Sequence, residues 1–198
     1  MHASSLEHMQ RLVGNYLTSN KPIVIADLGS YDVNGSYRQF FAREGWRYIG
    51  VDLAVGPNVD CVLQSPYRLP FKTGSLDLFI SGQAFEHIEF FWLTWLEMAR
   101  TLKPGGLIFL LAPSRGHEHR YPVDCWRYYP DGFAALAKYA SLDLLECHTD
   151  WSREGHPDSV EWGDTVGVFR KRKQSIFASI RGRLMQYLRY VAMPGYRC

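Results

Sequence analysis

The sequence of 198 residues is 46% hydrophobic and 15% aromatic, which is enough apolar material for one well-packed domain. It has no run of about 18 apolar residues and no basic stretch followed by a hydrophobic one at its start, so we expect neither a membrane span nor a secretory signal. The net charge of +2 is uneven, because residues 170–198 carry eight Lys or Arg and no Asp or Glu, against 14 basic and 20 acidic residues elsewhere.

The four cysteines are scattered along the chain without pairwise spacing, at Cys61, Cys125, Cys147 and Cys198. Disulfide frameworks and zinc sites are usually recognised by regularly spaced or paired cysteines. We therefore expect free thiols, with no disulfide framework and no cysteine-based zinc site.

The first predicted element is a helix. Residues 4–17 place apolar side chains at helical spacing, and Ser4 with Glu7 has the spacing of a capping box. We expect this helix, within residues 1–20, to cover one face of the domain.

Next comes a strand, a loop and a helix start. A β-branched run at 23–25 ends in Asp27 and Gly29, and a polar turn leads into the helical-looking segment 36–44. At the carboxyl end of a buried strand, unpaired N–H groups and a glycine allow close approach of a ligand. This stretch is therefore the expected binding site for a nucleotide-like molecule.

A second strand follows at 46–52, and a short third strand is expected near 59–63. Asp52 closes the second strand 23 residues after Gly29. An acidic residue near this spacing can accept hydrogen bonds from the hydroxyl groups of a ribose.

Two near-continuous apolar runs, at 76–81 and 107–112, are typical of strands buried on both faces. The segment 89–102 between them has helical periodicity, and the sequence KPGG at 103–106 should end that helix. A strand, a helix and a strand in this order indicate a right-handed crossover in a parallel sheet.

The remaining predicted elements are a helix at 130–139 and strands at 142–148 and 164–170. Because we expect a loop and no helix between these two strands, they should form an antiparallel pair at one edge of the sheet.

Five separated motifs follow one another along the chain: DLGSYDVNG at 27–35, YIGVD at 48–52, RLPF at 68–71 with SLDLFIS at 75–81, QAFEHI at 83–88 and LKPGGLIFLLAP at 102–113. In this order they resemble the class I S-adenosylmethionine-dependent methyltransferases, particularly a small bacterial group whose first motif is DLGSxDxNG. The resemblance spans residues 23–170. It implies an α/β fold: a Rossmann-like, mostly parallel sheet of seven strands in the order 3-2-1-4-5-7-6, with strand 7 antiparallel and helices on both faces. We accordingly place the methyltransferase domain at 1–170 and a separate tail at 171–198.

The resemblance implies S-adenosylmethionine as cofactor, with S-adenosylhomocysteine as product. The implied contacts are Asp27, Gly29 and Ser30 with the methionine portion, Asp52 with the ribose, Leu53 with the adenine ring, Gln64 and Ser65 near the adenine amino group, and Ser81 and Gln83 at the end of the fourth strand.

The first motif departs from the family pattern. Tyr31 and Val33 stand where small residues are common, and Ser65 stands where relatives often have an Asp. A dinucleotide site is an alternative, but the loop lacks the closely spaced GxGxxG that a pyrophosphate requires. These departures also keep open a non-catalytic cofactor-binding module within a larger assembly.

The acceptor side is predicted at 114–132, after the fifth strand, where relatives carry a similar HxHRYPxDxWRxYPDG segment. Methyl transfer to a hydroxyl requires alignment and removal of a proton, for which histidine is suited near neutral pH. We expect His119 or His117 to be the base, with Asp124 orienting it. The expected substrate-binding residues are His87, Arg120, Tyr121, Trp126 and Arg127.

Three alternatives stay open for these acceptor residues. Trp126 can belong to the core, and Arg120 and Arg127 can pair with acidic residues of the same loop as scaffolding. His117, His119 and Asp124 also resemble a metal site. We expect no metal, because metal-using sugar and quinone methyltransferases generally have a Glu where this chain has Gln83.

The tail repeats apolar residues at nearly four-residue steps over 176–191, with arginines between them, which predicts a basic amphipathic helix. It can pack against the domain or a second copy, rest on an anionic membrane surface, or bind nucleic acid. Because residues 1–169 are acidic overall, binding of nucleic acid is the least favoured of these three interpretations.

The sequence thus predicts a cytoplasmic methyltransferase acting on a hydroxyl of a small molecule or glycan, in cell-surface sugar or natural-product biosynthesis. The tail adds an alternative location, peripheral at the inner membrane surface. Methylation of RNA or protein is the other enzymatic alternative.

Overall fold

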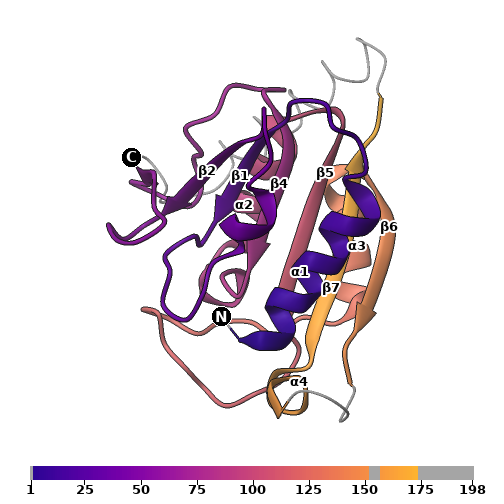
Figure 1. Ribbon diagram of the computed structural model, residues 1–198. Helices are drawn as coiled ribbons and strands as arrows, with labels where there is room; N and C mark the ends of the chain where they lie inside the picture. The colour runs from indigo at the N-terminus through magenta and orange to yellow at the C-terminus, as the bar shows by residue number, and fades with distance from the viewer. Residues whose placement is uncertain (1, 152–156, 174–198) are drawn as a thin grey trace, which may run out of the picture.

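The computed structural model describes residues 2–151 and 157–173. Its centre is a seven-stranded sheet in the order β3-β2-β1-β4-β5-β7-β6, in which β7 runs antiparallel to both of its neighbours (Figure 1). This confirms the expected α/β topology. The strands are β1 (Val24–Leu28), β2 (Arg47–Asp52), β3 (Cys61–Val62), β4 (Leu76–Gly82), β5 (Leu102–Pro113), β6 (Leu142–Thr149) and β7 (Asp164–Lys171).

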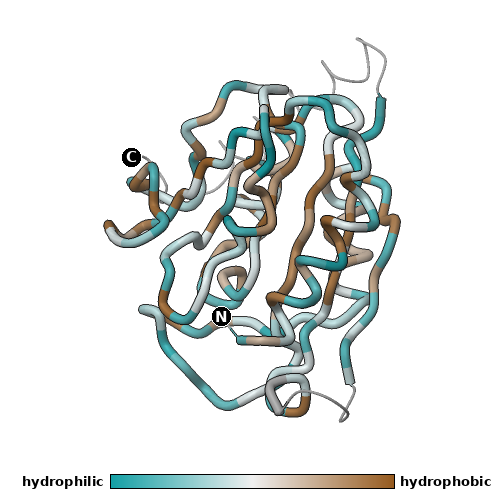
Figure 2. Tube along the Cα trace, in the orientation of Figure 1, coloured by the Kyte–Doolittle hydropathy of each residue, from teal (hydrophilic) through white to brown (hydrophobic). Residues whose placement is uncertain are grey.

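Helices cover both faces of the sheet. They are α1 (Ala3–Tyr16), α2 (Phe91–Thr101), α3 (Pro130–Ala140) and α4 (Pro157–Trp162), with single 3-10 turns η1 (Tyr37–Phe41) and η2 (Phe85–His87). Successive side chains of a strand point to opposite faces, and in β5 Ile108 packs with α2 and α3 whereas Phe109 packs with α1. The apolar strands lie between these helical layers (Figure 2).

Several predicted boundaries differ from the structure. The segment 36–44 forms only the turn η1, which is followed by Gly45 at φ +77°. The capping box is wrong, because Ser4 lies buried inside α1, whose N-cap residue is His2. The connection between β6 and β7 contains α4. Strand β5 begins at Leu102, the last residue of the predicted helix, so the predicted turn at 103–106 lies within this strand.

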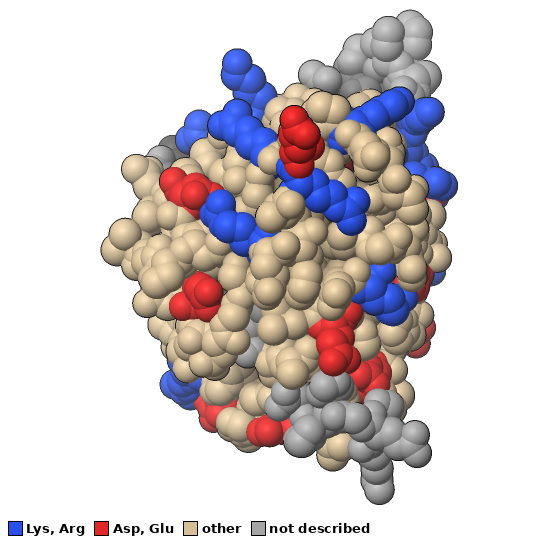
Figure 3. Space-filling view, viewed as in Figure 1, with Lys and Arg blue, Asp and Glu red and all other residues tan. Residues whose placement is uncertain are grey.

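The helix predicted at 176–191 lies outside the described residues. Within the described part of the chain, no helix has both the length and the hydropathy needed to span a bilayer. In Figure 3, most Lys and Arg side chains of the visible face lie toward the top, and several Asp and Glu side chains lie toward the bottom, where β5 ends.

Candidate active site

The loop after β1 folds back onto the end of β2. The N–H groups of Gly29 and Ser30 donate to the carbonyl of Val51 at 3.0 and 3.3 Å. Gly29 has a φ of +80°, and a Cβ atom here would lie 2.4 Å from the Cβ of Ala84. Only glycine meets both conditions, so the end of β1 is held close to the segment that follows β4.

Asp52 ends β2 at the same edge of the sheet. Its Oδ2 accepts the N–H of Tyr31 at 3.1 Å, and its Oδ1 accepts the N–H of Ala54 at 3.0 Å. The residue is half-buried, and each carboxylate oxygen keeps a further lone pair. This fixed carboxylate suits the predicted contact with a ribose, which stays a prediction.

Asp27 is almost completely buried in β1. Tyr48 donates its hydroxyl to Oδ2, whereas Oδ1 has no hydrogen-bond partner among the described residues. Burial raises the pKa of this carboxyl to about 7, although the hydrogen bond from Tyr48 acts in the opposite direction. The site therefore contains a buried acid that titrates near neutrality.

Tyr37, from η1, carries a buried hydroxyl at the end of β4. A Cβ atom on Gly82 would lie 2.0 Å from this hydroxyl, and the hydroxyl of Ser5 is 2.6 Å away. Burial raises the pKa of Tyr37 well above its ordinary value, and three carboxylates raise it further. These are the carboxylates of Asp164, Asp27 and Glu86. Carboxyl groups from β1, η2 and β7 thus all raise the pKa of the buried Tyr37 hydroxyl.

The side chains of Ser81 and Gln83 make contacts within the protein. The hydroxyl of Ser81 is fully buried and donates to the carbonyl of Leu28 at 2.9 Å, which joins β4 to β1. Gln83 donates through Nε2 to Oδ1 of Asp164 at 2.9 Å. Both residues lie at or just after the end of β4, and their expected place at the edge of the cofactor site stays a prediction.

The three residues expected near the adenine follow β2 and β3, which are parallel neighbours. Leu53 and Gln64 are exposed, and Ser65 is half-buried and accepts the N–H of Tyr67 at 3.2 Å. Loops after parallel neighbours meet at one edge of a sheet. The structure therefore brings these residues to the edge that carries Asp52.

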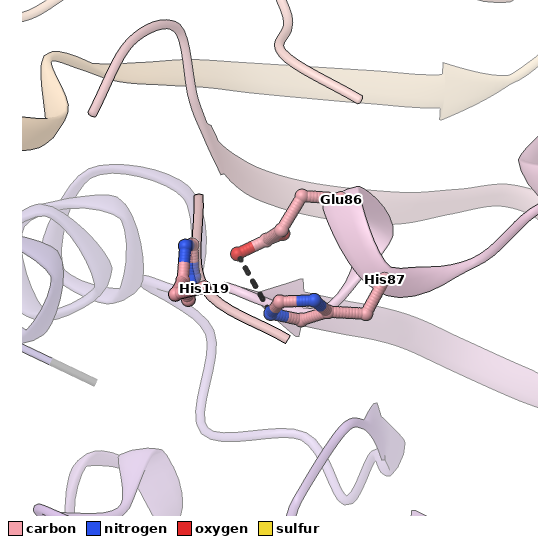
Figure 4. A group of neighbouring side chains, drawn as sticks. All are labelled: Glu86, His87 and His119. Atoms are coloured by element: carbon pink, nitrogen blue, oxygen red, sulfur yellow. Dashed lines mark ion pairs between the residues drawn. The ribbon is translucent and has the colours of Figure 1, made fainter. Parts of the chain in front are cut away.

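On the acceptor side, Glu86, His87 and His119 come together (Figure 4). Nε2 of His87 lies 3.7 Å from Oε1 of Glu86, and the rings of His87 and His119 meet edge to face at 4.9 Å. Burial raises the pKa of Glu86 to about 8, and burial also lowers the pKa of His87. A neutral imidazole thus lies beside a carboxyl group without hydrogen-bond partners among the described residues.

Backbone carbonyls orient both imidazole rings. Nδ1 of His87 lies 2.6 Å from the carbonyl of Val123, and Nδ1 of His119 lies 3.3 Å from that of His117. Because a carbonyl only accepts, each Nδ1 is the donor. With Nδ1 as the donor, the lone pair of the imidazole form of each ring is on Nε2.

The segment around His119 is held by Asp124 and Arg127. Asp124 accepts the N–H of His119 at 2.8 Å and binds Arg127 through both oxygens. Arg127 also donates to the carbonyls of Arg115 and His117. These contacts are those of a loop scaffold, the alternative that the sequence left open, and a role of Arg127 in substrate binding stays an untested prediction.

The other residues predicted for the acceptor side have exposed or partly exposed side chains. His117 is exposed and its Nδ1 lies 2.9 Å from Glu161, while Arg120 is exposed and pairs with Glu118. The ring of Tyr121 is 66% exposed and lies 5.8 Å from that of His87. Trp126 is partly exposed and donates through Nε1 to the carbonyls of Ile88 and Glu89. Of the three candidate metal ligands that the sequence indicated in this loop, His117 thus pairs with Glu161 and Asp124 pairs with Arg127, whereas His119 lies beside Glu86 and His87.

Sequence reasoning missed Glu86, Tyr37, Tyr48 and Asp164. Glu86 had a signal, since it is a charged residue in an otherwise apolar stretch directly after a buried strand. The two tyrosines and Asp164 had none, because their roles depend on contacts between distant parts of the chain.

The polar atoms left without partners test whether S-adenosylmethionine fits. Oδ1 of Asp27 and Oγ of Ser30, both near the end of β1, are buried and have no hydrogen bond among the described residues. Buried polar groups of this kind are costly unless a ligand pairs with them. A cofactor with a positively charged sulfonium and amino group meets this need, so the residues fit it.

Residues 27–110 match the family model described as Methyltransferase domain. An uncharacterized methyltransferase of Mycobacterium leprae is 30% identical over 165 residues, covering 73% of this chain and 59% of the relative. An uncharacterized methyltransferase of Mycobacterium sp. (strain JLS) is 36% identical over 152 residues, covering 68% and 58%. The chain therefore spans less than two thirds of the length of these curated relatives.

A solved structure with a similar fold is 1,6-didemethyltoxoflavin-N1-methyltransferase of Burkholderia thailandensis, with 1,6-didemethyltoxoflavin and S-adenosylhomocysteine bound. Its TM-score is 0.66 at 15% identity, covering 86% of this chain and 79% of that one. This likeness shows the Rossmann-like fold alone. The family match and the relatives support a methyltransferase domain in this chain.

Proposed function

We propose that this protein transfers a methyl group from S-adenosylmethionine to a hydroxyl of a small molecule or a glycan. The observation that carries the proposal is the fixed carboxylate of Asp52, held by two backbone N–H groups beside the turn at Gly29. The bound S-adenosylhomocysteine in the Burkholderia enzyme supports the same cofactor here. We favour cell-surface sugar or natural-product biosynthesis in the cytoplasm as the setting.

Residues at the ends of β1 and β2 would hold the cofactor. Asp52 would accept hydrogen bonds from the ribose hydroxyls, Leu53 would contact the adenine, and Asp27, Gly29 and Ser30 would contact the methionine portion. When bound, this cofactor supplies an activated methyl group, so the protein has only to align the acceptor and manage one proton.

We assign to His119 the removal of the proton from the acceptor hydroxyl. The ring Nδ1 of His119 lies against a backbone carbonyl, and its backbone N–H donates to Asp124. The lone pair on Nε2 can then take a proton from a hydroxyl. The exposed ring of Tyr121 borders this position and offers an apolar face to an acceptor. His117 remains the second candidate base.

Calorimetry tests the cofactor assignment. We expect S-adenosylmethionine and S-adenosylhomocysteine to bind one molecule per chain, and NAD not to bind. Binding of NAD alone would identify a dinucleotide-binding protein, and binding of none would leave the fold without a demonstrated ligand. Binding of the methyl donor without transfer to any acceptor would favour the non-catalytic module.

Transfer of a labelled methyl group to hydroxylated small molecules and glycans tests the reaction, with RNA and protein as competing acceptors. We expect His119→Ala to lower turnover by roughly 100-fold while cofactor affinity is kept, the usual scale of a lost general base. His148→Ala, on β6, is the matched imidazole control and should keep its rate. If only His117→Ala is slow, the base is His117.

A further inference from the structure

We infer that Glu86, His87 and His119 form a binding site for a divalent transition-metal ion such as zinc. Each side chain offers one ligand atom, and these atoms lie within 4.8 Å of one another (Figure 4). In residues 2–151 and 157–173, no other three His, Cys, Asp or Glu side chains are grouped in this way. The site comes from two places in the chain, the turn η2 and the loop after β5.

The first support is the carboxylate of Glu86. The side chain is 0% exposed, and neither oxygen has a hydrogen-bond partner among the described residues. Figure 4 shows it turned toward His87. A buried carboxylate is stable only when it is paired, protonated or bound to a cation. No Lys or Arg of the described chain makes an ion pair with it, so without a metal ion the carboxyl group stays protonated, and a bound ion would displace that proton.

The second support is the orientation of the two imidazoles. Histidines that bind metals almost always donate their other ring N–H to a carbonyl or carboxylate, which fixes the ring. His87 does so to Val123 at 2.6 Å, and His119 does so to His117 at 3.3 Å. Both rings are thus held by Nδ1 and offer Nε2 as a ligand.

The chemistry and spacing of the ligands indicate the kind of metal. Two imidazoles and one carboxylate are typical of zinc sites and related transition-metal sites, whereas magnesium and calcium prefer oxygen ligands. Ligand atoms of a tetrahedral zinc site lie about 3.4 Å apart. The observed 3.7 Å between Nε2 of His87 and Oε1 of Glu86 is close to this, and the ligand atom of His119 lies within 4.8 Å of both, so it would move toward the pair when the ion binds.

The role of the ion rests on the proposed function. Three protein ligands leave one position open, as in catalytic zinc sites. An acceptor hydroxyl next to a divalent cation loses its proton more readily. The ion would then do the work that the free His119 imidazole does in its absence.

The test uses the full chain, stripped of metal with a chelator and titrated with Zn²⁺ by calorimetry and with Co²⁺ by visible absorption. We expect one ion per chain and cobalt bands typical of mixed nitrogen and oxygen ligands. Glu86→Gln and His119→Ala should each weaken binding by at least about 10-fold. His117→Ala, which removes the neighbouring exposed imidazole, should bind as tightly as the unaltered protein. Circular dichroism shows that each variant is folded.

The proposal fails if the unaltered protein binds no stoichiometric Zn²⁺ or Co²⁺, or if the two variants bind as tightly as the unaltered protein. It also fails if His117→Ala alone abolishes binding. Binding of S-adenosylhomocysteine is measured on the same samples. Metal binding without cofactor binding would overturn the proposed function and keep the metal site, and the reverse result would overturn only the metal site.

Discussion

Arg127 donates to both carboxylate oxygens of Asp124, from Nη1 at 2.6 Å and from Nη2 at 2.9 Å. The side chain of Asp124 is only 2% exposed, and the hydrogen bonds from Arg127 hold its pKa well below the ordinary value. Oδ2 of Asp124 in turn accepts a hydrogen bond from the backbone N–H of His119 at 2.8 Å. The pair therefore sets the position of His119 from inside the loop.

We expect Arg127→Ala to lower the free energy of unfolding by about 3 kcal/mol, because it leaves the carboxylate of Asp124 buried without its partner. Urea unfolding measures this change. The control is Arg120→Ala, since Arg120 is 72% exposed and pairs with an exposed Glu118, so its loss should cost less than about 0.5 kcal/mol. Equal effects of the two substitutions would contradict a structural role for the Asp124 and Arg127 pair.

Gly29 is expected to tolerate no side chain. Gly29→Ala should destabilise the protein by about 2 kcal/mol, because its φ of +80° disfavours any Cβ atom and Ala84 occupies the space. Gly132→Ala is the matched control, since Gly132 lies in α3 with no atom within 4 Å of an added Cβ, and it should stabilise by about 0.5 kcal/mol. Thermal melting of the two variants should therefore shift in opposite directions, and a stable Gly29→Ala protein would refute the tight contact.

Burial of Asp27 predicts a pH dependence with an unusual sign. The pKa rises from its ordinary value of 3.8 to about 7 in the folded protein, so the folded state holds one more proton between these values. The stability contributed by the protonated form is complete below about pH 4 and is lost as pH rises toward 7, at about 1.4 kcal/mol per pH unit. The charged and titratable groups that act on it are Tyr48, Asp52 and Arg38.

Asp27→Asn removes this titration. The free energy of unfolding of the variant, relative to the unaltered protein, should therefore increase as the pH rises from 4 to 7. Urea unfolding at a series of pH values measures the difference. A constant difference across this range would mean that Asp27 is ionised throughout in the folded protein.

The order of strands and helices was predictable because each element is encoded by a local pattern of apolar residues. The apolar runs that became β4 and β5 are long enough to be buried on both faces, and the helical period between them gave α2. The shortening of the helix predicted at 36–44 to the turn η1 could not be predicted. Its apolar residues Tyr37 and Phe41 are equally consistent with a longer helix and with one short turn against α1.

The candidate site was predictable only in part. Asp52 and Gly29 follow from strand ends, and His119 follows from a polar loop after β5. The grouping of Glu86 with the two histidines depends on how that loop folds over η2, which rests on contacts such as the N–H of Cys125 with the carbonyl of Glu86 at 2.8 Å. The sequence also indicated Asp124 as the residue that orients a histidine base, which stays a prediction. Oδ2 of Asp124 lies 3.4 Å from Nδ1 of His119, and its pairing with Arg127 could not be foreseen from the sequence alone.

The last prediction concerns Asp52, on which the cofactor assignment depends. Asp52→Ala should weaken binding of S-adenosylhomocysteine by about 10- to 100-fold, because a hydrogen bond to a charged group contributes about 1.5–3 kcal/mol. Asp52→Asn keeps one acceptor oxygen and should lose less. Calorimetry measures both, with Asp143→Ala as the control, since Asp143 lies on β6, at the far edge of the sheet, and pairs with Arg172. An unchanged dissociation constant in Asp52→Ala would place the nucleoside elsewhere, because no ligand bound through this carboxylate can keep its affinity without it.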